Sequence, residues 1–265
     1  MSNGSEEDSI KRPSFALGLT EGIRAMMDFG WYFPYRVLTH SCSGGDGHPV
    51  LILPGFLATD LSTVPLRSFI HKLGYKVYGW GEGRNFAHAI YIDMLTQKLD
   101  RIYSKHKEPI TIIGWSLGGI YARQLAKQDP SIIRQIIVMG SPVQGVKMSN
   151  NATWMYELLR KSKLVAEDID QELIDDIPNP ADVPTTAIYT KEDGVVPWEL
   201  CLEEEDSWHQ NIQVRGSHLG LGFNPLVLQI IADRLRYEKS DWAYYEASNI
   251  VEELLVKAEA YQTAT

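Results

Sequence analysis

A glycine-rich hexapeptide around Ser116 carries a pattern typical of a serine nucleophile, Gly114-Trp115-Ser116-Leu117-Gly118-Gly119. A short β-branched run at residues 110–113 precedes it, and a helical pattern at residues 120–128 follows it. The sequence therefore predicts a sharp strand-to-helix turn. Glycine is expected two residues before and after the serine, because side chains there would collide. The hydroxyl would then be exposed at the carboxyl edge of a sheet.

A serine hydroxyl needs a base that takes its proton and an acid that orients the base. Five of the seven histidines precede the serine, whereas in a sheet of this kind the acid and then the histidine follow it. His209 lies before the strand predicted at residues 211–215, so we expect it at the opposite edge. His218 follows that strand in Gly216-Ser217-His218, at the edge that carries Ser116. His218 is therefore the predicted base.

Asp193 is the predicted acid because it directly follows the strand expected at residues 185–190. The loop after the preceding strand, residues 141–145, contains no acid. The neighbouring Glu192 remains an alternative. Asp193 is favoured because an Asp-Gly pair makes a tight turn that can aim a short side chain.

The attacked carbonyl also needs two N–H groups that stabilise its developing negative charge. Leu117, directly after the serine, is predicted to supply one of them. The second is predicted to be the N–H of Phe56, in the tripeptide that follows the strand expected at residues 50–53. Gly55 would let this backbone approach Ser116 closely.

Strand and helix patterns alternate from residue 48 to residue 237, which predicts a mostly parallel sheet with helices on both faces. Strands are expected at residues 50–53, 76–80, 110–114, 135–140, 185–190 and 211–215. Helices are expected at residues 66–73, 87–105, 120–128 and 225–236. Ligands of such sheets bind at the carboxyl ends of the strands, where the serine is predicted.

Residues 1–47 are predicted to form a polar tail and a docked helix. Ile23, Met26 and Met27 fall on one helical face, which we expect to pack on the core. The alternative is a helix in weak contact with a membrane surface, although the segment lacks the basic polar face of such helices. A short strand is expected at residues 36–41.

The longest connection between strands, residues 143–184, is predicted to form a short helical cap over the active edge. The expected substrate-binding residues, from this cap and from the core, are Phe56, Trp115, Trp154, Met155 and Leu158. The acids at residues 203–206 are interpreted as a solvated face. Residues 238–265 are predicted to end in a helix that docks through an apolar stripe.

The composition excludes several classes of protein. Of the 265 residues 44% are hydrophobic and 22% charged, which is typical of a globular domain. The net charge of −9 argues against a nucleic-acid partner. No apolar run reaches the length of a membrane-spanning helix, and an acidic N-terminus predicts a cytoplasmic protein. Two cysteines are too few for a disulfide framework or a metal site, so no metal is expected.

Taken together, four segments resemble the α/β-hydrolase superfamily, and most of all its bacterial lipase and esterase branch. They are Leu53-Pro54-Gly55-Phe56, Gly114-Trp115-Ser116-Leu117-Gly118-Gly119, Asp193-Gly194 and Gly216-Ser217-His218. The resemblance covers about residues 48–236. It implies cleavage of a small-molecule or lipid ester by a Ser-His-Asp triad through an acyl-enzyme, without metal or cofactor.

The sequence departs from the family in two respects. Antiparallel strands common in the family are not evident before residue 50, and the His-Gly-Gly-Gly oxyanion loop of some esterases is replaced by Pro54-Gly55-Phe56. A thioesterase or acyltransferase would share the same residues, and a catalytically silent binding protein is the alternative of another class. Acyl length, alcohol and oligomeric state do not follow from the sequence.

Overall fold

Six parallel strands and one antiparallel strand form a single sheet in the order β2-β1-β3-β4-β5-β6-β7. The computed structural model describes residues 10, 12–38, 44–145, 171–247 and 256–258. The strands are β1 (Pro49–Leu53), β2 (Lys76–Tyr78), β3 (Ile110–Trp115), β4 (Ile133–Met139), β5 (Thr185–Tyr189), β6 (His209–Val214) and β7 (Val256–Ala258). The helices are α1 (Phe15–Leu38), α2 (Val64–Lys72), α3 (Ile90–His106), α4 (Leu117–Gln128), α6 (Gln171–Asp176) and α7 (Pro225–Arg234), with short 3₁₀ helices η2 (Asp60–Thr63) and η3 (Trp198–Cys201).

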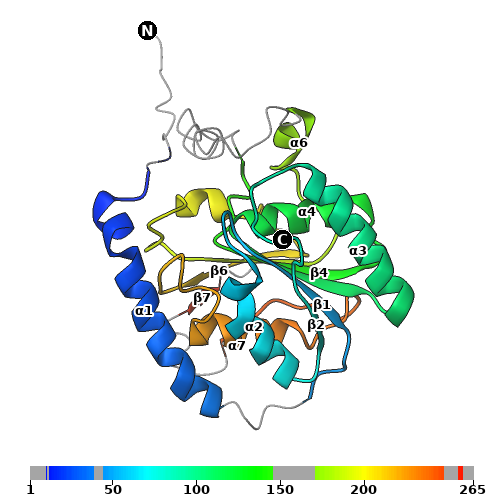
Figure 1. Ribbon diagram of the computed structural model, residues 1–265, viewed down its shortest axis with the longest axis horizontal. Helices are drawn as coiled ribbons and strands as arrows, with labels where there is room; N and C mark the ends of the chain where they lie inside the picture. The colour runs from blue at the N-terminus through cyan, green and yellow to red at the C-terminus, as the bar shows by residue number, and fades with distance from the viewer. Residues whose placement is uncertain (1–9, 11, 39–43, 146–170, 248–255, 259–265) are drawn as a thin grey trace, which may run out of the picture.

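Helices cover both faces of the sheet (Figure 1). Val50 and Ile52 of β1 pack with α2 and α7, whereas Leu51 and Leu53 of the same strand pack with α3 and α4. All four side chains are fully buried. Successive side chains of a strand point to opposite faces, so a strand covered on both sides is apolar throughout. The predicted fold class, a mostly parallel sheet between two layers of helices, is confirmed.

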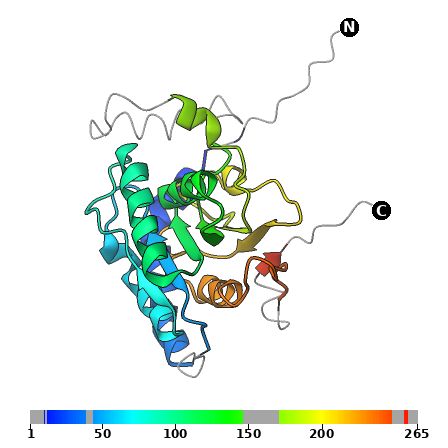
Figure 2. The same ribbon diagram turned by 90° about the vertical axis from the view of Figure 1, so that its right-hand side faces the viewer.

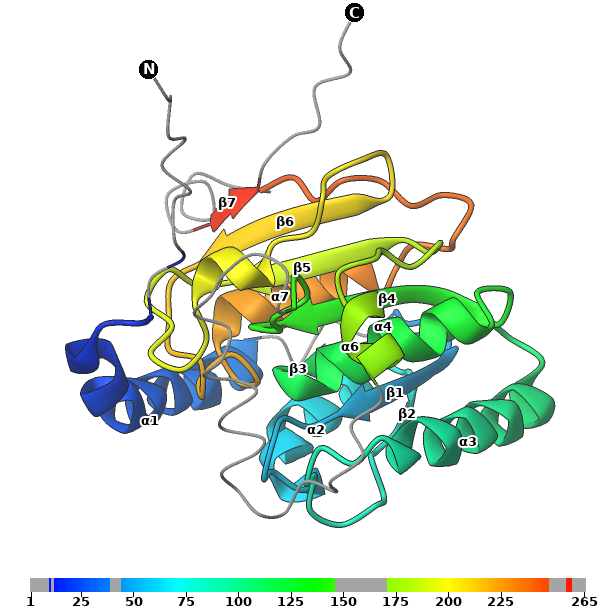
Figure 3. The same ribbon diagram turned by 90° about the horizontal axis from the view of Figure 1, so that it is seen from above.

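The register of the parallel strands brings four loops to one edge of the sheet, which Figure 3 shows from above. Leu53 of β1 pairs with Gly114 of β3, and Trp115 of β3 pairs with Met139 of β4. On the other side β5 ends beside β6, with Tyr189 paired to Gln213. The loops after β1, β3, β5 and β6 therefore meet at the carboxyl edge, where the predicted site residues lie.

Helix α1 docks on the molecule through the face opposite to the predicted one. Ile23, Met26 and Met27 are 61%, 75% and 64% exposed. The buried side chains of the helix include Glu21, Ala25 and Tyr32. The prediction was wrong because it assumed that the apolar face of an amphipathic helix packs inward. Here the inward face is partly polar, and its Glu21 carboxylate accepts hydrogen bonds from backbone N–H groups of the body.

Helix α1 packs on α7 and also bonds to α2, and these contacts hold its lower end in Figure 1 against the body. The Tyr32 hydroxyl donates to the Pro65 carbonyl at 3.1 Å, and the ring of Phe29 meets Phe223 edge-on at 5.3 Å. The helix continues to Leu38, so the strand expected from residue 36 is wrong for residues 36–38. Within the described ranges, no helix combines the length and the apolar character needed to cross a membrane.

The C-terminal segment contains a strand where a helix was predicted. Val256–Ala258 form β7, which pairs with β6 in antiparallel register, with Val256 opposite Val214. The helix prediction is therefore wrong for these three residues. An apolar segment at the edge of a sheet can pair the free backbone groups of the last strand, a long-range contact that helical periodicity does not reveal.

Of the predicted cap, the structure describes α6 and the two ends of the connection. Helix α6 lies over α4 in Figures 1 and 2, and Lys127 of α4 donates to the carbonyl and carboxylate of Asp176. The predicted substrate residues Trp154, Met155 and Leu158 lie outside the described residues.

A buried ion pair under this connection corrects a further prediction. Glu203, expected on a solvated face, is buried and accepts from Arg123 of α4 at 2.9 Å. Arg123 also donates to the carbonyls of Val143, Pro178 and Asn179. Burial raises the pKa of Glu203, against the opposing pull of the guanidinium. The pair therefore ties both ends of the 143–184 connection to the core.

Removing one partner of this pair is expected to be strongly destabilising. Arg123→Met leaves Glu203 buried without a counter-charge, which typically costs about 3–5 kcal/mol of unfolding free energy. Urea unfolding measures this loss. The double variant Arg123→Met/Glu203→Met is expected to recover part of it, because neither charge is then buried alone. A single variant as stable as the parent would show that the pair does not hold this region.

Candidate active site

Ser116 stands in a strained turn between β3 and α4. Its φ of 54° and ψ of −122° are unfavourable for a side chain, at a cost of about 1–3 kcal/mol. A Cβ on Gly114 would lie 2.4 Å from the Gly118 carbonyl oxygen, and a Cβ on Gly118 would lie 2.3 Å from that of Leu53. Neither position can carry a side chain, as the sequence predicts. The Ser116 N–H donates to the Met139 carbonyl at 2.8 Å, which fixes the turn to β4.

The structure brings His218 and Asp193 together from the loops after β6 and β5. Nδ1 of His218 lies 2.6 Å from Oδ2 of Asp193, and both side chains are buried. Oδ1 of Asp193 accepts from the N–H groups of Val195 at 2.7 Å and Val196 at 2.6 Å. Facing a carboxylate, Nδ1 carries the proton, so Nε2 has the lone pair of a base. The side chain of Glu192, the alternative acid, is exposed.

Two contacts place His218 beside the end of β3, where Ser116 begins the turn. The indole N–H of Trp115 donates to the His218 carbonyl at 3.1 Å. A Cβ on Gly140, just after β4, would lie 3.0 Å from Nδ1 of His218. Trp115 was predicted to bind substrate, but its side chain is buried and its polar atom is used by the histidine loop. Its observed contact is therefore one that positions His218.

The loop after β1 lies against Ser116. A Cβ on Gly55 would lie 3.1 Å from the Ser116 Cβ, so this backbone approaches the serine as closely as predicted. Fully buried Asn85 holds the loop: its side chain donates to the Pro54 carbonyl at 3.0 Å, and its carbonyl accepts from Leu57 at 2.7 Å. Sequence reasoning missed Asn85, because a polar residue in an irregular stretch carries no periodic signal.

Leu117 begins α4, a helix of 12 residues. The N–H groups of a first helical turn have no partner within the helix, and the helix dipole is positive at this end. The Leu117 N–H thus lies next to the serine at the end of a helix that favours negative charge. The Phe56 N–H, the other predicted donor, belongs to the loop that lies against Ser116.

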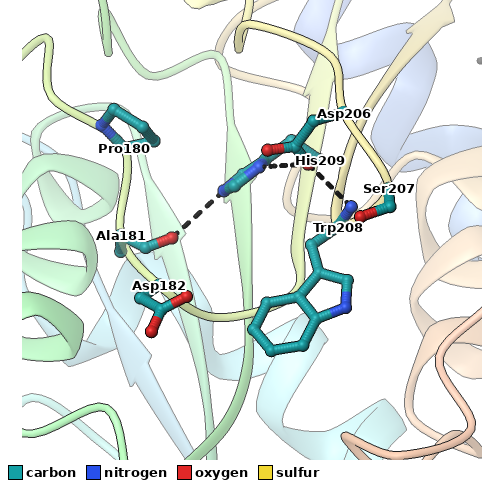
Figure 4. Close-up of a pocket in the computed structure, with 7 residues that line it drawn as sticks. All are labelled: Pro180, Ala181, Asp182, Asp206, Ser207, Trp208 and His209. Atoms are coloured by element: carbon teal, nitrogen blue, oxygen red, sulfur yellow. Dashed lines mark hydrogen bonds and ion pairs between the residues drawn. The ribbon is translucent and has the colours of Figure 1, made fainter.

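His209, the other histidine that follows the serine, is the first residue of β6 and so lies at the amino edge of the sheet, opposite to Ser116. Figure 4 shows it beside a pocket. The Nδ1 and Nε2 of His209 are 2.7 Å from Oδ1 of Asp206 and 3.1 Å from the Ala181 carbonyl oxygen. Both ring nitrogens are therefore engaged. The pocket beside it, of about 360 Å³, is lined by Pro180, Ala181, Asp182, Asp206, Ser207, Trp208 and His209. The prediction that His209 lies away from Ser116 is confirmed.

Cys201 is a further residue of a type that can act as a nucleophile. The thiol of Cys201 is free and buried, and burial raises its pKa, so it remains protonated. Among the residues that the structure describes, no group of three or more His, Cys, Asp or Glu side chains is arranged to hold a metal ion.

Comparisons with known proteins bear on the fold. Residues 81–178 match the model of a family described as the PGAP1-like alpha/beta domain. Lipase B of Aspergillus fumigatus is 17% identical with a TM-score of 0.55, over 74% of this chain and 55% of the lipase. The chain thus spans about half the length of that lipase.

Two smaller proteins match over nearly their whole length. A metagenome-derived lipolytic enzyme is 19% identical with a TM-score of 0.54, over 73% of this chain and 95% of its own. A thioesterase domain from the curacin biosynthetic pathway is 12% identical with a TM-score of 0.50, over 74% and 93%. A search of curated proteins gave no match. From its sheet order, its strained turn at Ser116 and these likenesses, the chain has the α/β-hydrolase fold, that of the superfamily its sequence resembles.

Proposed function

We propose that this protein is a serine hydrolase that cleaves carboxylic esters, with a lipase- or esterase-like substrate range. Ser116 is the nucleophile, His218 the general base and Asp193 the acid that orients it. The observation that carries the proposal is the 2.6 Å contact between His218 and Asp193 at the edge that bears the strained serine turn. Ser116 is half-buried, and strained backbone of this kind is a feature of functional sites.

The reaction proceeds in two halves. Ser116 Oγ attacks the ester carbonyl carbon while Nε2 of His218 takes the hydroxyl proton, and the carbonyl oxygen becomes an oxyanion. The N–H groups of Phe56 and Leu117 donate to that oxygen. His218 then returns the proton to the leaving alcohol as the C–O bond breaks, which leaves an acyl-enzyme. Water, deprotonated by His218, then attacks the acyl carbonyl. As the bond between that carbon and Ser116 Oγ breaks, His218 returns the proton to Oγ, which releases the carboxylic acid and restores the serine.

Asp193 acts through the histidine. Its Oδ2 holds Nδ1–H and so keeps Nε2 free to accept the serine proton. When His218 is protonated, the buried carboxylate stabilises the imidazolium. The two backbone donors on Oδ1 fix the carboxylate in the orientation that this requires.

The acyl group is proposed to lie against Phe56 and against Trp154, Met155 and Leu158 of the predicted cap, the last three being proposed from the sequence alone. A thioesterase or acyltransferase remains the alternative, since it would use the same residues. The experiment that decides is a comparison of kcat/KM for p-nitrophenyl esters of graded chain length, for matched thioesters, and for acyl transfer to an alcohol. Oxygen-ester hydrolysis as the fastest reaction supports the proposal, and a preference for thioesters or transfer contradicts it.

The exposed face of α1 is proposed to contact the surface of a lipid aggregate that contains the ester. None of the exposed residues from Phe15 to Trp31 is charged, so the matching surface is an apolar one. The opposite face of the same helix touches the loops of both His218 and Asp193, and Leu219, beside the histidine, adds a further half-exposed apolar side chain. Apolar contact here would bring lipid esters next to the serine.

Met26→Glu is therefore expected to slow hydrolysis of an ester carried in neutral phosphatidylcholine vesicles. Burying a methionine side chain is worth about 1.5–3 kcal/mol, so the loss is expected to be about 10-fold or more. Hydrolysis of a short soluble ester should stay unchanged. Trp208→Glu, an exposed site at the amino edge, is the matched control. Equal rates of parent and variant on vesicles would exclude this contact.

A further inference from the structure

Three polar side chains of α1 reach the two loops that carry His218 and Asp193. Glu21 is buried, and its two carboxylate oxygens serve different loops. Oε2 accepts from the Gly194 N–H at 3.1 Å, and Oε1 accepts from the Leu219 N–H at 2.8 Å. One carboxylate therefore bridges the residue after Asp193 and the residue after His218.

Arg24, one turn after Glu21, fixes the backbone that precedes Asp193. Its guanidinium donates to the Glu192 carbonyl at 2.6 Å and pairs with Glu21 at 2.6 Å. The backbone on both sides of Asp193 is thus held by α1. The approach is close, since a Cβ on Gly194 would lie 2.5 Å from the Leu17 carbonyl oxygen. Only glycine fits at that position.

Asp28, two turns after Glu21, holds the backbone before the histidine. Its Oδ2 accepts from the Ser217 N–H at 3.1 Å and from the Ser217 hydroxyl at 2.8 Å. The loop is shaped around this carboxylate, because a Cβ on Gly220 would lie 2.0 Å from Oδ2. Residues on both sides of His218 therefore bond to α1, through Asp28 and through Glu21.

These contacts hold the loop after β5, which carries Asp193, at a fixed distance from the loop after β6, which carries His218. In the described structure one direct hydrogen bond outside the triad joins them, from the Thr190 hydroxyl to the Gly216 carbonyl at 3.0 Å. Hydrogen bonds to ionised carboxylates are about twice as strong as neutral ones. Catalytic groups lose about 10²-fold in rate when they are misplaced by about 1 Å.

We propose that Glu21 and Asp28 are positioning residues, which hold the loops of Asp193 and His218 at the separation that the 2.6 Å contact requires. The consequence for catalysis rests on the proposed function, whereas the consequence for the His218–Asp193 contact does not. The pattern explains why α1 turns a polar face inward and leaves its apolar face outside.

The variants Glu21→Gln and Asp28→Asn test this with little change in size. Glutamine retains one oxygen, so its NH₂ group would face a backbone N–H that now donates to a carboxylate. Tyr32→Phe is the control on the same helix, because it removes the bond to Pro65, which lies outside both loops. Thermal unfolding shows how far each variant loosens α1 in general.

The readout is the far-downfield proton resonance of His218 Nδ1–H in protein labelled with ¹⁵N-histidine, identified by its absence in Asp193→Asn. Glu21→Gln and Asp28→Asn are expected to weaken or shift it, whereas Tyr32→Phe keeps it. For a soluble ester, kcat is expected to fall about 10- to 100-fold in the two variants, with KM within about 3-fold. An unchanged resonance and kcat in both variants would overturn the proposal.

The two proposals can fail separately. A resonance that depends on Glu21 and Asp28 in a protein without ester hydrolysis would support the positioning role and refute the proposed function. Ester hydrolysis in which neither variant changes kcat would support the function and refute the positioning role.

Discussion

Ser116→Ala is expected to lose ester hydrolysis by about 10⁴-fold or more, because the attacking oxygen is removed while the fold remains. The variant should unfold at a temperature equal to or above that of the parent. Alanine keeps the Cβ of serine, so the turn is unchanged and no buried contact is lost. Initial rates on a short p-nitrophenyl ester, corrected for background hydrolysis, measure the effect.

The matched control for this variant is Ser131→Ala, which removes an exposed hydroxyl that bonds to Asp129 far from the turn. It should hydrolyse the ester as the parent does. More than a few per cent of the parental rate in Ser116→Ala would mean that another group attacks the ester.

Asp193→Asn is the second large effect that we expect, a fall in kcat of about 10⁴-fold. The asparagine oxygen can still accept from Val195 and Val196, so the loop should keep its shape. Its NH₂ group, however, would face Nδ1 of His218 and force the proton to Nε2. In that tautomer the histidine cannot take the proton of Ser116.

Glu192→Gln serves as the comparison for the acid, because it lies next to Asp193 and its side chain is exposed. We expect its kcat to stay within about 3-fold of the parent, as for most exposed substitutions. If the two variants exchanged their effects, the acid would be Glu192, and the contact between His218 and Asp193 would have no catalytic role.

The sequence predicted the parallel core well because its signals are local. β1 is apolar at every position and β3 is polar only at Thr111, and a nearly continuous apolar run is typical of a strand buried on both faces. The turn at Ser116 follows from two glycines that leave no space for a Cβ. Strand ends deviated by at most two residues from the prediction, as expected where the pattern fades into a turn.

The failures concern contacts between distant parts of the chain. The inward face of α1 depends on Gly194, Ser217 and Leu219, whose positions are set by two strands much later in the sequence. The sequence pattern of a single helix shows only which face its apolar residues share, and not which face the rest of the chain covers. A sequence signal for this face did exist: Glu21 and Asp28, the two acids of α1, stand two turns apart and so share a face.

Long-range pairing also explains two further corrections. Glu203 was interpreted as solvated because acids cluster around it, but its partner Arg123 lies 80 residues earlier in a buried helix. The strand at Val256–Ala258 exists because β6 would otherwise end the sheet with unpaired backbone groups. Neither partner can be identified from the local pattern.

The most direct test of the account is the site of reaction with a fluorophosphonate, mapped by mass spectrometry of peptides from the full-length protein. We expect one adduct per chain, on Ser116, formed by the parent and by Glu192→Gln. It should form far more slowly in His218→Ala and not at all in Ser116→Ala. An adduct on another residue, or none on the folded parent, would contradict the assignment of Ser116 as the nucleophile.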